Sequence, residues 1–157
     1  GLATRYLGVD PTDRDPGEQR QAFQDFSELL NRYPDSEYAP DARQRMIAIR
    51  NRLAELELHA ARYYVRRQAY MAANNRARYV VENFPESPST EEALILMAET
   101  YEALDLDDAA SDAVRLLAVN HPESDAFDDN MRFQGRDLAP ENRSLLNVMT
   151  FGLFGRD

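Results

Sequence analysis

One four-residue motif occurs three times in this chain, and it constrains the fold more than any other feature. Each copy holds an aromatic residue or a histidine, then proline, then an acidic residue, then serine. The copies are Tyr33-Pro34-Asp35-Ser36, Phe84-Pro85-Glu86-Ser87 and His121-Pro122-Glu123-Ser124. Proline cannot continue a helix, because it lacks an amide donor and clashes with the preceding turn. The motif therefore predicts the same kind of helix end at three places.

The residues before each proline indicate what the helices pack against. Small or apolar residues stand 12, 8 and 5 positions before each proline, which is helical spacing. They are Ala22, Phe26 and Leu29, then Ala73, Ala77 and Val80, then Ala110, Val114 and Leu117. This is the tetratricopeptide pattern, in which a small residue lets two antiparallel helices approach closely. No stretch shows strand-like alternation. We predict an all-α fold, a tetratricopeptide-type α-solenoid of antiparallel helix pairs, over residues 1–122.

The spacing of the prolines predicts one unusually long helix. Pro122 follows Pro85 by 37 residues, whereas Pro85 follows Pro34 by 51, a difference of 14. Fourteen residues are two heptads, which lengthen a helix while nearly keeping its buried face in register. We expect one elongated helix over about 38–68, roughly 45 Å long at ~1.5 Å per residue. A break near Asn51 is the alternative.

Shorter helices are expected over 15–33, 69–83, 90–104 and 106–120. Asp15, with Pro16 next to it, is a candidate N-cap for the first of them. Ser89 with Glu92 has the form of a capping box, and Asp105 with Asp108 offers a similar start.

The character of the chain changes after the third motif. Residues 123–157 are expected to form an acidic linker followed by an apolar C-terminal tail. A solenoid needs its last apolar face covered, so the tail is a candidate cap for the final helix. Docking onto a partner or a membrane surface is the other interpretation. The candidate docking residues are Leu145, Leu146, Met149, Phe151 and Phe154.

Composition excludes several classes of function. The net charge is −10, which argues against nucleic acid as a partner. There is no cysteine, hence no disulfide, and no apolar run approaches the ~18 residues of a membrane span. His59 and His121 are the only histidines, and they are not spaced as metal ligands. We expect no catalytic, cofactor or metal site and no small-molecule substrate; an all-α hydrolase using one buried glutamate is the enzymatic alternative.

All 18 basic residues are arginines, and five of them lie close to one expected helix-pair turn. They are Arg62, Arg66, Arg67, Arg76 and Arg78, with Tyr63 and Tyr70 nearby. A basic group on an acidic protein can dock an acidic partner surface, and arginine and tyrosine are enriched where binding energy concentrates. The alternative is that these arginines pair with the chain's own Glu55, Glu57 and Glu82. Both interpretations stay open on sequence alone.

Several stretches beyond the generic repeat resemble the BamD family, the tetratricopeptide lipoproteins of the outer-membrane β-barrel assembly machine. These stretches are Gly8-Val9-Asp10, Asp13-Arg14-Asp15-Pro16, Ala22-Phe23, Asp25-Phe26-Ser27, Tyr33 to Tyr38, Arg52-Leu53-Ala54, Ala61-Arg62-Tyr63-Tyr64 and Asn75-Arg76. The resemblance implies the C-terminal part of a periplasmic scaffold held at the outer membrane by a lipidated N-terminal cysteine. This chain has no cysteine. The piece is therefore expected to be soluble by itself.

The resemblance also implies partners and site residues. In the family, the C-terminal repeats hold the membrane-proximal POTRA domain of BamA, with accessory lipoproteins nearby. Asn75-Arg76 matches a family Asn-Arg pair whose arginine forms a salt bridge to the POTRA domain, so Arg76 is the primary expected contact. Asn75, Tyr70, Arg66 and Arg67 are the accompanying candidates. The alternative is a generic tetratricopeptide co-chaperone that grips a peptide, although such clamps rely on lysine, which is absent here.

Overall fold

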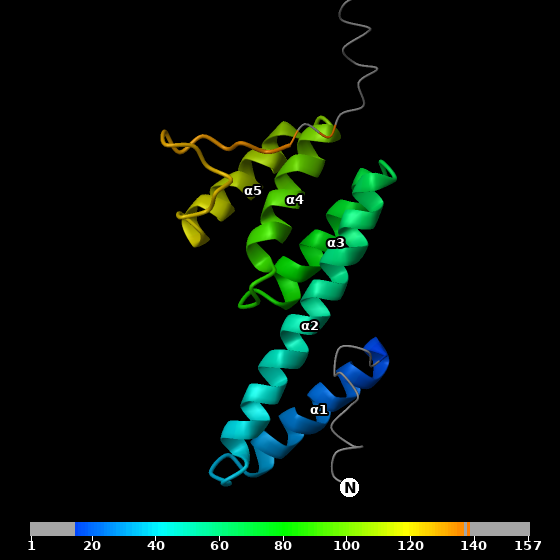
Figure 1. The fold of residues 1–157 in the computed structure, drawn as a ribbon, viewed down its shortest axis with the longest axis vertical. Helices are drawn as coiled ribbons and strands as arrows, with labels where there is room; N and C mark the ends of the chain where they lie inside the picture. The colour runs from blue at the N-terminus through cyan, green and yellow to red at the C-terminus, as the bar shows by residue number, and fades with distance from the viewer. Residues whose placement is uncertain (1–14, 137, 139–157) are drawn as a thin grey trace, which may run out of the picture.

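The computed structural model describes residues 15–136 and 138, and five helices account for most of them. They are α1 (Pro16–Arg32), α2 (Ala39–Arg66), α3 (Tyr70–Asn83), α4 (Thr90–Ala103) and α5 (Asp107–Asn120). Each helix packs against the next one along the chain, and α2 also touches α4 (Figure 1). The expected all-α solenoid of successive helix pairs is confirmed within these residues.

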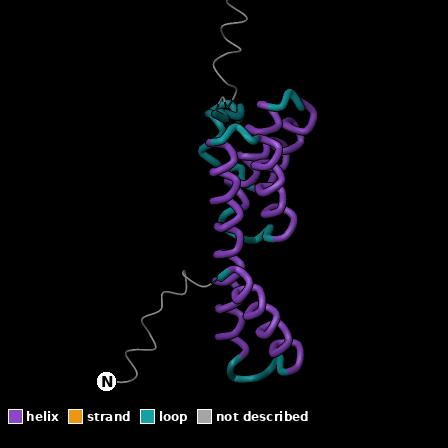
Figure 2. Tube along the Cα trace, turned by 90° about the vertical axis from the view of Figure 1, so that its right-hand side faces the viewer, coloured by secondary structure: helices purple, strands orange, loops and turns teal. Residues whose placement is uncertain are grey.

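The long second helix sets the shape of the molecule. α2 has 28 residues and runs without a break through Asn51, as the two-heptad insertion predicted. α1 lies along its N-terminal half, α3 and α4 pack on its C-terminal half, and α5 packs on α4 (Figures 1 and 2). The insertion therefore separates α1 from the later helices and leaves space between α1 and α3.

The three copies of the motif fold in the same way. The residue before each proline ends a helix with φ of −134° at Tyr33, −131° at Phe84 and −136° at His121. Each donates its N–H to the carbonyl oxygen four residues earlier. The serine N–H of each motif then bonds back to the carbonyl of that same residue, at 3.2, 2.9 and 3.1 Å. His121 thus occupies the same helix C-cap position as Tyr33 and Phe84.

Small residues allow the helices to approach each other closely. Ala73 and Ala77 of α3 are fully buried, and so are Ala61 of α2 and Ala98 of α4. Ala110 of α5 is only 4% exposed. The first copy of the pattern is less buried: Leu29 of α1 is 38% exposed, because within residues 15–136 α1 packs mainly on α2.

The expected capping interactions do not form. Neither Asp15 nor Ser89 caps its helix with its side chain. The Ser89 hydroxyl instead lies 3.5 Å from a carboxylate oxygen of Glu55, and Glu92 is paired with an arginine of α2. Asp105 has a φ of 59° and precedes the N-cap position, which Leu106 occupies. For Ser89 and Glu92, contacts to Glu55 and Arg62 of α2 have replaced the local capping box that the sequence suggested.

Beyond α5 the described chain turns back over the last helix pair. We call residues 124–136 the C-terminal strap. The Asp128 carboxylate accepts the N–H groups of Asn130 and Arg132, each at 2.9 Å, and this closes a tight turn. Phe127 and Phe133 pair across the turn in antiparallel fashion and pack against the core. Much of the expected linker is therefore packed against α4 and α5. The candidate tail residues, Leu145 to Phe154, lie outside the described residues.

Candidate protein-interaction site

The fold divides the arginine group into internally paired and exposed members. Three of the five form ion pairs with the acids named as alternatives: Arg62 with Glu55, Arg76 with Glu57 and Arg78 with Glu82. The alternative of internal pairing therefore holds for these three arginines. The group is therefore not a continuous basic surface.

Arg62 links α2 to α4, and three of its guanidinium nitrogens donate hydrogen bonds in doing so. Its Nε and Nη2 donate to the two carboxylate oxygens of Glu92 on α4, at 2.7 and 2.5 Å. Its Nη1 donates to Glu55 on α2, at 2.9 Å. The hydrogen bond from Arg62 holds the pKa of Glu92 below its usual value, because it favours the charged carboxylate. Such a fork-to-fork pair is a structural contact.

Arg66 and Arg67 form no ion pair within the described part of the chain, and both are exposed at the end of α2. The Arg67 guanidinium lies 5.4 Å from the ring centre of Tyr63, which is cation–π distance. Tyr70, at the start of α3, donates its hydroxyl to the carbonyl of Leu138. These three candidates share the α2–α3 turn.

Arg76 lies about 9 Å further along α3 than Tyr70, at ~1.5 Å per residue, and belongs to a different surface. Its Nη1 donates to Oε2 of Glu57 at 3.0 Å, and this bond raises the pKa of Arg76. Arg20 of α1 approaches the other oxygen of Glu57 at 3.9 Å. Glu57 is 12% exposed in its side chain, whereas Arg76 is 47% exposed. A nearly buried acid is thus bracketed by two accessible arginines.

This bracket lies in a groove between α1 and α3. One hollow, of about 330 Å³, is lined by Arg20, Glu57, Asn75, Arg76 and Tyr79. A second, of about 230 Å³, shares Arg20 and Tyr79 with it and adds Phe23, Gln24, Leu53, Asn83 and Phe84. We call the two together the α1–α3 groove. It has an arginine-rich end and an apolar end, as a protein-binding surface does.

Sequence reasoning missed Arg20 and Tyr79 as members of this surface. Arg20 lies more than fifty residues from Arg76 in the chain, and the two come together because α1 and α3 both pack on α2, where each arginine reaches Glu57.

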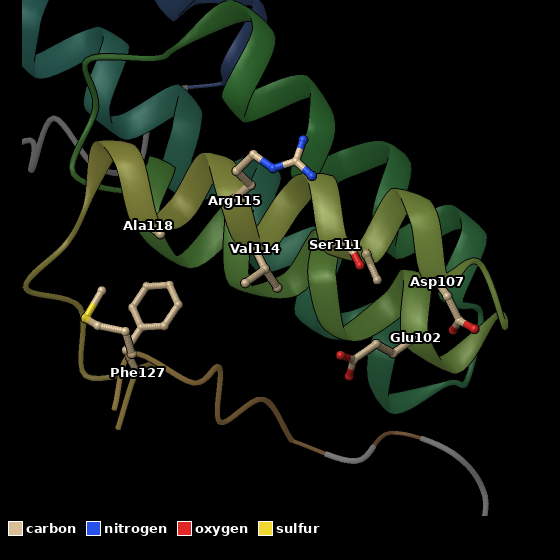
Figure 3. A pocket seen from close by; sticks show the side chains of 9 residues that line it. Glu102, Asp107, Ser111, Val114, Arg115, Ala118 and Phe127 are labelled. Atoms are coloured by element: carbon tan, nitrogen blue, oxygen red, sulfur yellow. The ribbon is translucent and has the colours of Figure 1, made fainter. Parts of the chain in front are cut away.

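A third hollow, of about 350 Å³, opens between α5 and the C-terminal strap (Figure 3). Val114 and Ala118 of α5 form its apolar wall together with Phe127 of the strap. Glu102 and Asp107 stand at one end of it (Figure 3). This is the outer face of the last helix, which a further repeat covers in a longer solenoid.

The described residues contain no group of three or more histidine, cysteine or acidic side chains arranged to hold a metal ion. Over the same part of the chain, none of the helices has both the length and the apolar character needed to cross a membrane. The candidate interaction features of the described residues are the α1–α3 groove, the exposed arginines at the α2–α3 turn and the C-terminal strap.

Stacked helix pairs of this kind, with grooves and charged surface residues, define a helical-repeat scaffold. The chain belongs to the YfiO family of outer membrane lipoproteins, whose model matches residues 2–116. It is 42% identical over 114 residues to the outer membrane protein assembly factor BamD of Vibrio cholerae, covering 73% of this chain and 47% of that relative.

Other relatives carry the same name. The chain is 41% identical over 120 residues to BamD of Neisseria gonorrhoeae, covering 76% of this chain and 45% of the relative. It is 37% identical over 119 residues to BamD of Xylella fastidiosa strain Temecula1, covering 76% and 41%. The chain thus spans less than half the length of these relatives. Their names describe outer membrane protein assembly factors.

Proposed function

We propose that this chain is part of a non-enzymatic adaptor in the outer-membrane β-barrel assembly machinery, at the periplasmic face of that membrane. The family and the names of its relatives support the assembly role. The architecture supports the adaptor role, because a solenoid presents extended surfaces to other proteins. Its partners are the POTRA region of BamA and accessory lipoproteins.

Arg76 is the proposed contact to an acidic side chain of the POTRA region, with Asn75 beside it in the α1–α3 groove. The observation that carries this proposal is that Glu57 is paired with two arginines, Arg76 and Arg20. An incoming carboxylate can draw Arg76 away, and Glu57 then keeps Arg20 as its partner. The exchange leaves no buried charge unpaired, which is the usual penalty for breaking such a pair.

The α2–α3 turn is the proposed second contact area, for an accessory lipoprotein. Arg66 and Arg67 are exposed there, and Tyr63 is 45% exposed. Arginine and tyrosine side chains combine a large contact area with directional hydrogen bonds, and they dominate many interfaces.

A pull-down with the purified POTRA region of BamA tests the proposal. The native chain is compared with Arg76→Glu and with Arg45→Glu, a control on α2 whose pair with Asp41 is solvent-exposed and lies outside the groove. We expect capture of the native chain and of the control, and loss of capture for Arg76→Glu. Failure to capture the native chain contradicts the adaptor role, and equal capture of all three removes Arg76 from the site.

A further inference from the structure

The hollow between α5 and the C-terminal strap lies where the repeat pattern calls for another helix (Figure 3). The last two motif prolines, Pro85 and Pro122, are 37 residues apart, so Thr90 corresponds to Phe127. Thr90 begins α4, which packs on α3. Phe127 instead lies in the strap, which runs beside α5 without forming a helix. Within the described residues, the strap therefore stands in for the helix that would follow.

The same correspondence identifies the face of α5 that a covering helix would contact. Asn74 of α3 is 1% exposed, because its amide donates to the carbonyl oxygen of Met97 and to Oγ1 of Thr100 on α4, at 3.3 and 2.9 Å. The equivalent residue of α5, 37 positions later, is Ser111. Ser111 lines the hollow and is exposed. The hollow thus lies over the face of α5 that corresponds to the α4-binding face of α3.

The wall of this hollow is apolar. Val114 and Ala118 of α5 line it together with Phe127 and Met131 of the strap. Met131 is 54% exposed, which is high for an apolar side chain beside a hollow of about 350 Å³. A groove of this kind between stacked elements fits the apolar face of an amphipathic helix.

The charge around the hollow indicates the chemistry of the partner. Glu102 and Asp107 line one end of it (Figure 3). Residues 102–132 carry nine acidic side chains and two arginines, whereas residues 15–101 carry 14 acidic side chains and 11 arginines. Arg115, which also lines the hollow, is already paired with an acid of α5. The acidity of the chain is therefore concentrated at this end, and the complementary surface is basic.

We propose that the hollow between α5 and the C-terminal strap is a docking site for a basic amphipathic helix of another protein, which packs there as α4 packs on α3. The apolar face of that helix contacts Val114, Ala118 and Phe127, and its basic side chains reach Glu102 and Asp107. No residue that lines this hollow also lines the α1–α3 groove. The site is a third partner surface, and it does not depend on the proposed contact with BamA.

A peptide copied from α4 is the probe for this site. Residues 90–103 contain four glutamates at positions that share one face of the helix. The probe is a fluorescent peptide of these residues with the substitutions Glu91→Lys, Glu92→Lys, Glu99→Lys and Glu102→Lys. A second peptide keeps the glutamates, and both are titrated against the full chain and followed by anisotropy. We expect the lysine peptide to bind, and the glutamate peptide to bind at least about tenfold more weakly. Equal binding of the two peptides, or no binding of the lysine peptide, overturns the proposal.

Two substitutions on α5 distinguish docking in the hollow from general attraction to an acidic surface. Ala118→Glu places a charge in the apolar wall while making the chain more acidic. Val119→Glu is the matched control, because it adds the same charge at a residue that is 73% exposed and does not line the hollow. We expect Ala118→Glu to bind the lysine peptide at least about tenfold more weakly than Val119→Glu, with equal helicity by circular dichroism. Equal affinity of the two variants contradicts docking in the hollow.

Neutralising the acidic end tests the charge contribution without changing the apolar wall. Glu102→Gln combined with Asp107→Asn is expected to weaken binding of the lysine peptide by about three- to tenfold. Asp25→Asn combined with Glu28→Gln removes the same charge from exposed positions of α1 and is expected to leave binding unchanged. Equal losses in the two double variants would overturn the assignment of the acidic end.

Sedimentation of the native chain tests a second copy as the occupant. Two copies would bring the same acidic face together, which like charges oppose, so we expect a single mass at all concentrations. A mass that doubles with concentration, and that Ala118→Glu returns to the monomer, would assign the hollow to a second copy and overturn the proposal.

Discussion

Nη1 of Arg76 lies 3.0 Å from Oε2 of Glu57, so the arginine proposed to reach a partner is already paired within the chain. The other oxygen of Glu57 faces Arg20 at 3.9 Å. Two arginines thus share one nearly buried acid. This arrangement makes Arg76 exchangeable, and it predicts that Glu57 competes with the partner's acid for the same guanidinium.

Glu57→Gln is expected to strengthen binding to the POTRA region by about three- to tenfold, or ~0.7–1.4 kcal/mol. The neutral amide keeps the volume of the side chain but no longer competes as a charge. Calorimetric titration measures the effect. The same substitution in an Arg76→Glu background should give no gain, and a gain there would show that Glu57 acts through some other group.

Arg62→Ala is expected to destabilise the fold by about 1–2 kcal/mol, because it leaves Glu55 and Glu92 without their shared partner across α2 and α4. The figure is kept low because all three side chains are partly exposed, which weakens ion pairs. Arg115→Ala is the control, since its pair with Asp112 is a solvent-exposed contact within one helix. Urea unfolding should show a change below about 0.5 kcal/mol for this control; equal losses would contradict the assignment.

Stability is expected to fall in acid partly through Glu92. Arg62 lowers the pKa of Glu92 from its ordinary value of 4.5. A carboxyl group with a lowered folded-state pKa stabilises the fold fully above its unfolded pKa, and this contribution is lost as the pH falls through the folded pKa. Unfolding free energies measured from pH 7 downward should therefore decline below about 4.5. In Glu92→Gln the decline should be shallower.

Residues after Pro140 are expected to be dispensable for folding. The strap already covers part of the last helix pair through Phe127, Phe133 and Arg136, all before that point. A chain ending at Pro140 should keep the helicity and melting temperature of the native chain, as measured by circular dichroism. A large drop in melting temperature would assign the apolar tail to the core as a cap and would contradict this prediction.

The order and length of the helices could be predicted because they depend on local features. The prolines of the repeated motif fix three helix ends, and the 14 extra residues fix the elongation of α2. The buried alanines at Ala73 and Ala110 follow from the same spacing. These features act within a few turns of chain, where spacing is a reliable guide.

Side-chain partners across the fold were harder to predict. Glu92 looked like a capping residue for α4, but Arg62, 30 residues earlier, is charged and can reach it bidentately. The tie between Glu99 and Arg136 spans 37 residues and depends on how the strap turns at Asp128. The Arg76 contact to Glu57 was among the alternatives, whereas the approach of Arg20 required the actual packing of α1.

Calorimetric titration of the POTRA region of BamA with the native chain and with Arg76→Glu tests the adaptor role most directly. Covering Arg76 at an interface desolvates its charge pair, and truncating one member of such a pair typically costs ~2–5 kcal/mol, against under ~1 kcal/mol for an exposed pair. We expect Arg76→Glu to lose at least tenfold in affinity, about 1.4 kcal/mol, with unchanged helicity. Equal affinity of the native chain and Arg76→Glu would contradict it.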